Sequence, residues 1–217
     1  NGITISNFLD IFNLQSQTDI INNTISNNVM ENISLNAIEI SILSFNHSTF
    51  TISLNSIERN YVRNIGNLGI FFSFFSVEEV ASGNFGNNLI AENIINETAF
   101  FDIFFFFVRL NVDVAKTICN NTFVNNTGSG NKEIIFLNDN NNSLIIENLE
   151  YSAIIICNST NITMRNVTIN ASENFDNNGI IVMFSDGINI SNIYSNRNAF
   201  PLYLLGSRNI ILTNITS

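Results

Sequence analysis

Few residues of this sequence have the types and spacing needed for acid–base chemistry. The single histidine, His47, lies in the string Asn46-His47-Ser48 with no carboxylate near it, and such a histidine is typical of a turn. The seven aspartates occupy different offsets within the repeat described below: Asp10, Asp19, Asp102, Asp113, Asp139, Asp176 and Asp186. Asp176 and Asp186 share one repeat, which leaves a carboxylate pair across a loop open. Since glycoside hydrolysis needs two carboxyl groups facing each other over a cleft, we expect solvated loop acids and no catalytic residue.

Two cysteines, Cys119 and Cys157, are the other candidates for chemistry. Cys119 falls two residues before a repeated Asn, at an inward position, and Cys157 ends an apolar run. Because these offsets differ, direct stacking of the two side chains is not expected, and two buried free thiols are predicted. The Gly-Gly-x-Gly-x-Asp string of calcium-binding β-rolls does not occur, so the sequence predicts neither a metal site nor a cofactor.

The composition argues against several kinds of partner. The 217 residues carry a net charge of -10 with only 8 Lys and Arg, which cannot form the basic stripe that a phosphate backbone requires. The longest apolar runs, residues 65–77 and 99–110, are interrupted and fall short of the roughly 20 residues that span a bilayer. We therefore expect no nucleic-acid partner and no membrane span. The 43 asparagines require a structural explanation.

A short phrase returns along the chain: apolar, any, apolar, any, Asn. Its clearest copies are residues 3–7, 144–148, 162–166, 188–192 and 210–214, and weaker copies end at Asn23, Ser56, Asn93 and Asn121. The end points are 16 to 37 residues apart, a spacing typical of solenoids. Most intervals also contain an apolar run followed by a turn former, which favours two or three short strands over a helix. The pattern predicts a single all-β solenoid domain over residues 1–217, a segment of a longer protein, with about eight coils.

The Asn at the end of the phrase is expected to have a structural role. Asn tolerates the left-handed backbone of a corner, and its amide can bond to the equivalent Asn one coil away, at about 4.8 Å. The sequence therefore predicts one ladder on one corner, formed by Asn7, Asn23, Asn93, Asn121, Asn148, Asn166, Asn192 and Asn214.

In this phrase and its spacing the sequence resembles the pectin-lyase-like right-handed parallel β-helix repeat proteins, in particular their Asn-rich surface and adhesin types. The resemblance covers residues 3–217 and implies a right-handed parallel β-helix, but it implies function only weakly. Carbohydrate lyases and hydrolases share this fold, although the Gly-His-Gly and Arg-Ile-Lys strings of the hydrolase branch do not occur here. Four tyrosines, Tyr61, Tyr151, Tyr194 and Tyr203, keep stacking on a sugar ring open.

The chain contains 13 Asn-x-Ser/Thr sequons, where its composition would give about 7 by chance. Those off the predicted ladder include the expected glycosylation sites: Asn46, Asn96, Asn125, Asn141, Asn158, Asn170 and Asn189. Asn166 and Asn214 are sequons on the ladder, where a buried side chain could not carry a glycan. The alternative is that polar turns of an Asn-rich chain form sequons without function. The enrichment favours a secreted, glycosylated chain.

Several runs are apolar at both strand parities, so both faces of these strands are expected to be covered. The residues concerned are Phe104, Phe105, Phe106, Phe107, Ile154, Ile155, Ile156, Ile180, Val182 and Phe184. Stacked coils would line the outer side chains into one apolar stripe, and such a stripe usually marks an interface. The alternative is burial by the chain's own insertions.

The sequence thus predicts a structural solenoid of an extracellular or cell-surface assembly, not an enzyme. It would associate with copies of itself or with other subunits through the stripe or its coil ends. The alternatives are a carbohydrate-active or carbohydrate-binding β-helix and an adhesin segment. Both ends of the sequence are in phase with the repeat and lack polar caps, and open coil ends recruit other strands, so a free-standing monomer is not expected.

Overall fold

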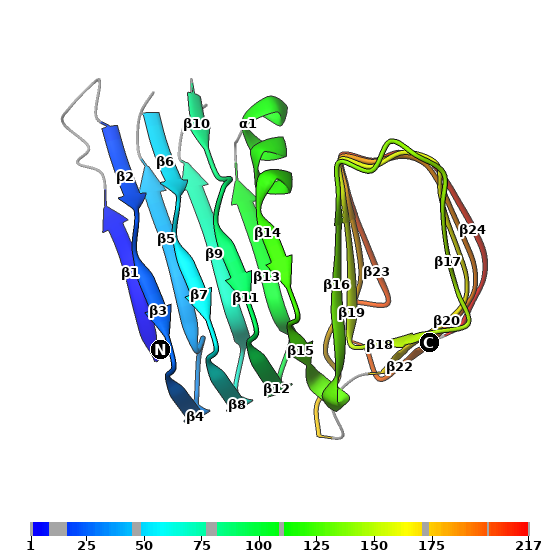
Figure 1. Cartoon of the computed structure of the whole chain (residues 1–217), viewed down its shortest axis with the longest axis horizontal. Coiled ribbons are helices and arrows are strands. Elements are labelled where there is room, and N and C mark those ends of the chain that lie inside the picture. The colour runs from blue at the N-terminus through cyan, green and yellow to red at the C-terminus, as the bar shows by residue number, and fades with distance from the viewer. Residues whose placement is uncertain are drawn as a thin grey trace.

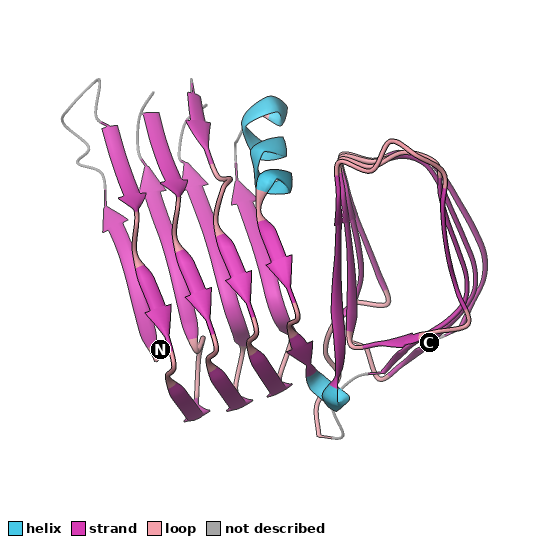
Figure 2. Ribbon diagram, in the orientation of Figure 1, coloured by secondary structure: helices cyan, strands magenta, loops and turns pink. Residues whose placement is uncertain are grey.

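The computed structural model describes residues 2–8, 17–44, 49–76, 82–108, 111–170, 174–198 and 200–216. These residues form an almost entirely β protein whose strands pair in parallel across successive coils, as a β-solenoid requires (Figures 1 and 2). The coils form two groups, here called the N-terminal stack (residues 2–128) and the C-terminal stack (residues 132–216). Figure 1 shows the first stack from its side and the second along its stacking direction, so the two directions cross steeply.

The N-terminal stack is built from four parallel sheets. The first contains β1 (Ile3–Phe8), β5 (Ile38–Ser44), β9 (Leu68–Ser76) and β13 (Phe101–Val108), and the second contains β2 (Gln17–Ile21), β6 (Thr49–Ser53) and β10 (Ser82–Asn84). The third contains β3 (Thr24–Ser26), β7 (Ser56–Glu58), β11 (Leu89–Ala91) and β14 (Thr122–Val124). The fourth contains β4 (Val29–Ile33), β8 (Tyr61–Ile65), β12 (Ile94–Thr98) and β15 (Thr127–Gly128).

One helical segment, which the sequence pattern did not predict, replaces a strand in the last coil of this stack. The helix α1 (Val112–Lys116) and the 3-10 turn η1 (Thr117–Asn120) stand beside β10, where the second sheet would continue (Figure 1). The Asn111 side chain caps α1 by accepting a hydrogen bond from the backbone N–H of Asp113, which satisfies one of the free donors at the helix start.

The strand direction reverses between the stacks. The turn η2 (Ser129–Asn131) connects β15 to β16 (Lys132–Asn138), and these two strands pair antiparallel. The fourth sheet therefore continues into the C-terminal stack as one eight-stranded sheet. One sheet of the C-terminal stack then contains β16, β19 (Ala153–Cys157), β21 (Gly179–Met183) and β23 (Leu202–Leu205), all parallel. The other contains β17 (Leu144–Glu147), β20 (Ile162–Asn170), β22 (Asp186–Asn196) and β24 (Arg208–Thr216), and β18 (Glu150–Tyr151) also pairs with β20.

The sheet β16-β19-β21-β23 has a hydrophobic core on each of its faces. Ile154 and Ile156 of β19 point into the core of the C-terminal stack, whereas Ile155 and Cys157 belong to the core of the N-terminal stack. The ring of Phe136 in β16 stacks on a ring of the last coil of the N-terminal stack, with centroids 4.2 Å apart. The C-terminal stack therefore covers the end of the N-terminal stack. Each fully buried Ile contributes about 1.5–3 kcal/mol to the stability of this arrangement.

Two buried ladders of asparagines run through the N-terminal stack. The first contains Asn23, Asn55, Asn88 and Asn121, and the second contains Asn28, Asn60, Asn93 and Asn126. Within each ladder the Nδ2 group of one Asn donates to Oδ1 of the Asn in the next coil, at 2.9–3.0 Å. Most of these rungs also donate to a backbone carbonyl of the coil before, for example Asn88 Nδ2 to Ile52 O at 3.0 Å. The ladders thus satisfy polar groups where the chain turns inside the core.

A third ladder, of a different kind, runs along the C-terminal stack. It contains Asn148, Asn166, Asn192 and Asn214, whose amides are joined by hydrogen bonds of 3.0–3.2 Å. All four residues are exposed and have a left-handed backbone, with φ between 51 and 56°. In the N-terminal ladders it is often the residue before the rung that is left-handed, such as Leu54 before Asn55. Asn is thus the corner residue itself in the C-terminal stack. In the N-terminal stack its side chain points inward and forms hydrogen bonds to the neighbouring coils.

The residues of the single predicted ladder are therefore divided among these three ladders. Asn148, Asn166, Asn192 and Asn214 do lie on one corner within hydrogen-bonding reach of each other. Asn23 and Asn121 belong to the first ladder of the N-terminal stack, and Asn93 belongs to the second. The side chain of Asn7 lies outside the described residues. Weak copies of the phrase end at different corners, which is why their spacing looked irregular.

Candidate functional site

The junction between the two stacks contains a fully buried carboxylate, that of Asp102 in β13. Its Oδ1 accepts hydrogen bonds from Thr98 Oγ1 at 2.8 Å and from Ser129 Oγ at 2.7 Å. Its Oδ2 accepts from the Ser129 backbone N–H at 2.6 Å, from Ser152 Oγ at 2.9 Å and from Asn178 Nδ2 at 2.6 Å. The donors come from β12, from η2 and from the segments before β19 and β21, so one carboxylate connects both stacks.

Burial raises the pKa of the Asp102 carboxyl above its ordinary value of 3.8. The hydrogen bonds from Ser129, Asn178 and Thr98 act in the opposite direction because they stabilise the ionised form, but desolvation is the larger effect. The expectation that the aspartates are solvated loop acids is therefore wrong for Asp102. The alternation of side chains along a strand of residues 101–108 predicts that Asp102 lies on one face. It cannot show that a second stack covers that face.

A second layer of amides surrounds this carboxylate. Asn177 Nδ2 donates to Ser129 Oγ at 2.7 Å and to Thr98 Oγ1 at 3.1 Å, and the Asn198 amide donates to the Asn177 carbonyl at 2.7 Å. Gly128 lies so close that a Cβ at this position would come within 2.4 Å of Asp102 Oδ2 and of Ser152 Oγ. Only glycine fits there, which explains the residue at the end of β15.

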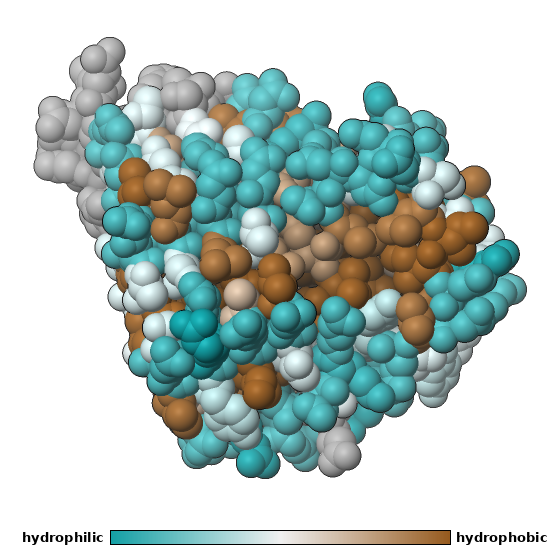
Figure 3. All heavy atoms as spheres, viewed as in Figure 1, coloured by the Kyte–Doolittle hydropathy of each residue, from teal (hydrophilic) through white to brown (hydrophobic). Residues whose placement is uncertain are grey.

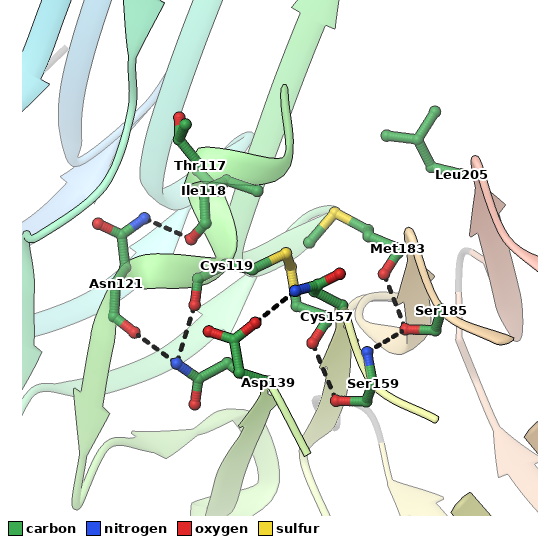
Figure 4. Close-up of a disulfide and its surroundings, with 12 residues drawn as sticks. Thr117, Ile118, Cys119, Asn121, Asp139, Cys157, Ser159, Met183, Ser185 and Leu205 are labelled. Atoms are coloured by element: carbon green, nitrogen blue, oxygen red, sulfur yellow. Dashed lines mark hydrogen bonds between the residues drawn. A yellow bond between two sulfur atoms is a disulfide. The ribbon is translucent and has the colours of Figure 1, made fainter. Parts of the chain in front are cut away.

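A disulfide between Cys119 and Cys157 lies in the same junction (Figure 4). Cys119 belongs to η1 in the last coil of the N-terminal stack and Cys157 ends β19, and both are fully buried. The prediction of two free thiols is therefore wrong. Coil offsets apply to residues stacked along one axis, whereas these cysteines belong to two stacks that meet at an angle. Nearby, the Asn138 amide donates to the Cys119 carbonyl at 2.8 Å, which adds a polar link between the stacks.

An aromatic groove of about 410 Å³ lies on the outer face of the first sheet, beside the C-terminal stack. The rings of Phe71, Phe104, Phe101 and Phe200 lie nearly parallel along it, with successive centroids 6.4, 4.6 and 5.8 Å apart. Tyr203 meets Phe104 edge-on at 6.2 Å. Among the lining side chains, only those of Asn67 and Tyr203 carry hydrogen-bonding groups. The groove can therefore hold a flat or apolar group, with polar contacts from only two of its side chains.

The residues of the predicted apolar stripe are mostly covered by the chain itself. Ile154, Ile155, Ile156, Ile180 and Val182 are buried because their sheet lies between the two cores. Phe105 is also buried, Phe104 and Phe107 are half-buried, and Phe184 is a half-buried corner residue with φ of 50°. Phe106 is 43% exposed at the groove. The expectation that both faces are covered is therefore correct for β19 and β21, where the covering surface is intramolecular, whereas Phe104 and Phe106 of β13 line the open groove.

The predicted glycosylation sites differ in their exposure. Asn125, Asn141 and Asn189 are exposed, Asn96, Asn158 and Asn170 are half-buried, and Asn46 lies outside the described residues. Asn158 also donates a close hydrogen bond to Asp139. The ladder sequons Asn166 and Asn214 are exposed, so the expectation that they are buried is wrong, although their amides are engaged in the ladder.

If the chain is secreted, we expect glycans at Asn125, Asn141 and Asn189 and none at Asn166. A glycan at Asn166 would replace an amide hydrogen in the ladder, whereas the three exposed sites have room for a sugar. Peptide mass mapping after enzymatic deglycosylation in heavy-oxygen water would locate each occupied Asn. A glycan at Asn166, or a secreted chain with Asn125, Asn141 and Asn189 all bare, would contradict this assignment.

The two aspartates that the sequence left open as a carboxylate pair, Asp176 and Asp186, form separate ion pairs. Asp176 pairs with Arg197 at 3.3 Å and Asp186 pairs with Arg208 at 2.8 Å, so the structure does not bring these two aspartates into one pair. The pKa of Asp186 is lowered mainly by the Asn209 amide and then by Arg208. Asp10 and His47 lie outside the described residues. Across the described ranges no cluster of His, Cys, Asp and Glu could hold a metal ion, and no helix is long and apolar enough to cross a membrane.

Sequence reasoning missed the rungs Asn28, Asn55, Asn60, Asn88 and Asn126 and the polar cluster around Asp102. A usable signal existed for the rungs. Two asparagines five residues apart recur every 32 or 33 residues, at 23 and 28, 55 and 60, 88 and 93, and 121 and 126. No comparable signal exists for the cluster, because Asn178 lies 76 residues from Asp102 in sequence.

Comparison of the chain with models of known protein families, with curated proteins and with solved structures gives no match.

Proposed function

We propose that this chain is a right-handed parallel β-helix, with four coils in each stack, that serves as a structural scaffold of an extracellular or cell-surface assembly. The observation that carries the proposal is the junction, where a buried disulfide and a buried carboxylate fix one stack across the end of the other. Disulfides persist in oxidising compartments and are rare in the cytosol, so this pair favours a secreted protein. The sequon excess supports the same location.

The arrangement of acidic side chains favours a scaffold over a hydrolase. The buried Asp102 is enclosed by five hydrogen-bond donors and has no room for a substrate. Asp176 and Asp186 are each occupied by a different arginine. A rigid body of this kind presents its outer faces to partners, which are other copies of the chain or other subunits of the assembly.

The mass of the intact native protein tests this proposal. We expect Cys119 and Cys157 to resist alkylation when the protein is denatured without a reductant, and to react after reduction. We also expect the mass to fall on treatment with a peptide glycosidase, and the chain to be labelled on intact cells by a membrane-impermeant reagent. Free thiols, no glycan and no surface labelling together would refute an extracellular scaffold.

Carbohydrate binding is the second candidate function, and the aromatic groove favours it. Parallel Phe rings with Tyr203 at their side resemble the platforms on which sugar rings stack. Titration of the folded protein with neutral oligosaccharides, followed by the perturbation of the Tyr203 side-chain resonances, separates this candidate from a scaffold without a ligand. Binding that is unchanged in Phe104→Ala would exclude the groove as its location.

A further inference from the structure

The first coil of the C-terminal stack leaves its core uncovered on the side away from the second coil. In the second coil Ile154, Ile156 and Ile162 are all 0% exposed. Their register partners in the first coil, Ile135, Leu137 and Leu144, are only half-buried although they pack against the same core. Figure 3, viewed along this stack, shows apolar surface at the same place with polar residues around it. One further layer of chain would complete the burial.

The backbone at this face also has free hydrogen-bonding groups. Among the described residues, β17 pairs only with β20. The N–H groups of Leu144 and Asn148 donate toward that neighbour, to Asn161 O and Arg165 O. Since alternate residues of a strand point to opposite sides, the N–H groups of Ile145 and Glu147 point to the open side. Such an edge is a template for another strand.

The asparagine ladder ends at this face with a free donor. Asn148 Oδ1 accepts from Asn166 Nδ2, and within the described part of the chain no residue accepts from Asn148 Nδ2. In the three observed steps of the ladder, the later Asn always donates to Oδ1 of the earlier one. An Asn placed one layer before Asn148 would supply the missing acceptor. The open face lies in the middle of the chain, because β16 is reached from the N-terminal stack through η2.

We propose that the open first coil of the C-terminal stack accepts an extended strand of a partner polypeptide carrying the phrase apolar-x-apolar-x-Asn. The contact it would form is already made three times in this structure, by β17 with β20, β20 with β22 and β22 with β24. In each, apolar side chains two residues apart enter the core and Asn meets Asn at the corner. The partner strand thus continues an established series of interfaces by strand addition.

A peptide with the sequence of residues 162–170, Ile-Thr-Met-Arg-Asn-Val-Thr-Ile-Asn, is a suitable probe. Labelled and blocked at both ends, it is titrated with the whole chain and followed by fluorescence anisotropy. We expect saturable binding of one peptide per chain. A peptide with Ala in place of its central Asn should bind several-fold more weakly, because it cannot accept from Asn148.

Matched variants at one exposed position test the geometry. Ile145→Pro removes the backbone N–H that points to the open side, and the Ile145→Ala control removes only the side chain. We expect Ile145→Ala to bind like the original chain and Ile145→Pro to bind about 10-fold more weakly or worse. Asn148→Gly, which keeps the left-handed backbone accessible, should also weaken binding and serves as the test if Ile145→Pro does not fold.

Two results would overturn the proposal: no saturable binding of the peptide, or equal binding by the original chain, Ile145→Pro and Asn148→Gly. Dimerisation of the chain that Ile145→Pro abolishes would support it and identify a second copy as the source of the strand. The inference deepens the proposed scaffold role but depends only on coil stacking. The strand-addition proposal can therefore fail while the disulfide, the glycans and the extracellular location of the scaffold are verified. Equally, the peptide can bind to a chain that is not an extracellular scaffold.

Discussion

Replacement of Asp102 by Ala is expected to lower the free energy of unfolding by roughly 3–5 kcal/mol. The substitution leaves the buried donors on Thr98, Ser129, Ser152 and Asn178 without an acceptor and opens a cavity between the stacks. Chemical denaturation followed by circular dichroism measures the loss. The exposed Asp19 provides the control, since Asp19→Ala should change stability by no more than about 0.5 kcal/mol.

The pH dependence of this effect follows from the pKa of Asp102. Because burial raises the folded-state pKa above the ordinary value of 3.8, the folded protein binds the proton more tightly than the unfolded chain does. The contribution of this group to stability is then greatest below the unfolded pKa and declines as pH rises through the raised folded pKa. Asp102→Asn has the same shape but does not titrate at this position. The free energy of unfolding of the original chain, relative to that of Asp102→Asn, should therefore be higher at about pH 4 than at about pH 8. The opposite slope would show that the hydrogen bonds outweigh desolvation.

The sequence predicted the C-terminal stack more accurately than the N-terminal one. In the C-terminal stack the phrase has a single structural meaning, because its Asn is the left-handed corner residue of every coil. The intervals of 18, 26 and 22 residues between Asn148, Asn166, Asn192 and Asn214 are the true coil lengths. In the N-terminal stack each coil has two inward Asn positions five residues apart, so copies of the phrase from different corners were joined into one series.

The junction could not be predicted from the repeat because a repeat describes contacts along one stack. The β19 residues illustrate the limit. Ile154, Ile155 and Ile156 showed that both faces of the strand are covered, but not that the second face meets the last coil of the same chain. The same geometry brings Cys119 and Cys157 together across a Cα–Cα distance of 5.3 Å, although their positions within the repeat differ. Contacts between crossed stacks depend on where the turn η2 directs the chain.

The buried and exposed ladders have the same side chains in different surroundings, the protein core and water. This difference predicts different contributions to stability. Asn88 is 1% exposed, and its Oδ1 accepts from both the backbone N–H and the amide of Asn55. Asn192 makes the corresponding contacts to Asn166 and Asn214 on the surface, where water replaces a lost partner. A buried group without a partner keeps its full desolvation cost, whereas an exposed one does not.

Asn88→Ala is accordingly expected to lower the free energy of unfolding by about 2–5 kcal/mol, because the Asn55 N–H and the Ile52 carbonyl each lose a partner inside the core. Asn192→Gly removes the same amide from the exposed ladder while allowing the left-handed backbone, and it should cost no more than about 1 kcal/mol. Denaturant titrations of both variants in parallel measure the difference. Equal losses of stability in the two variants would contradict this difference. The amide hydrogen bonds would then contribute alike in water and in the core, and the ladders would act through corner geometry instead.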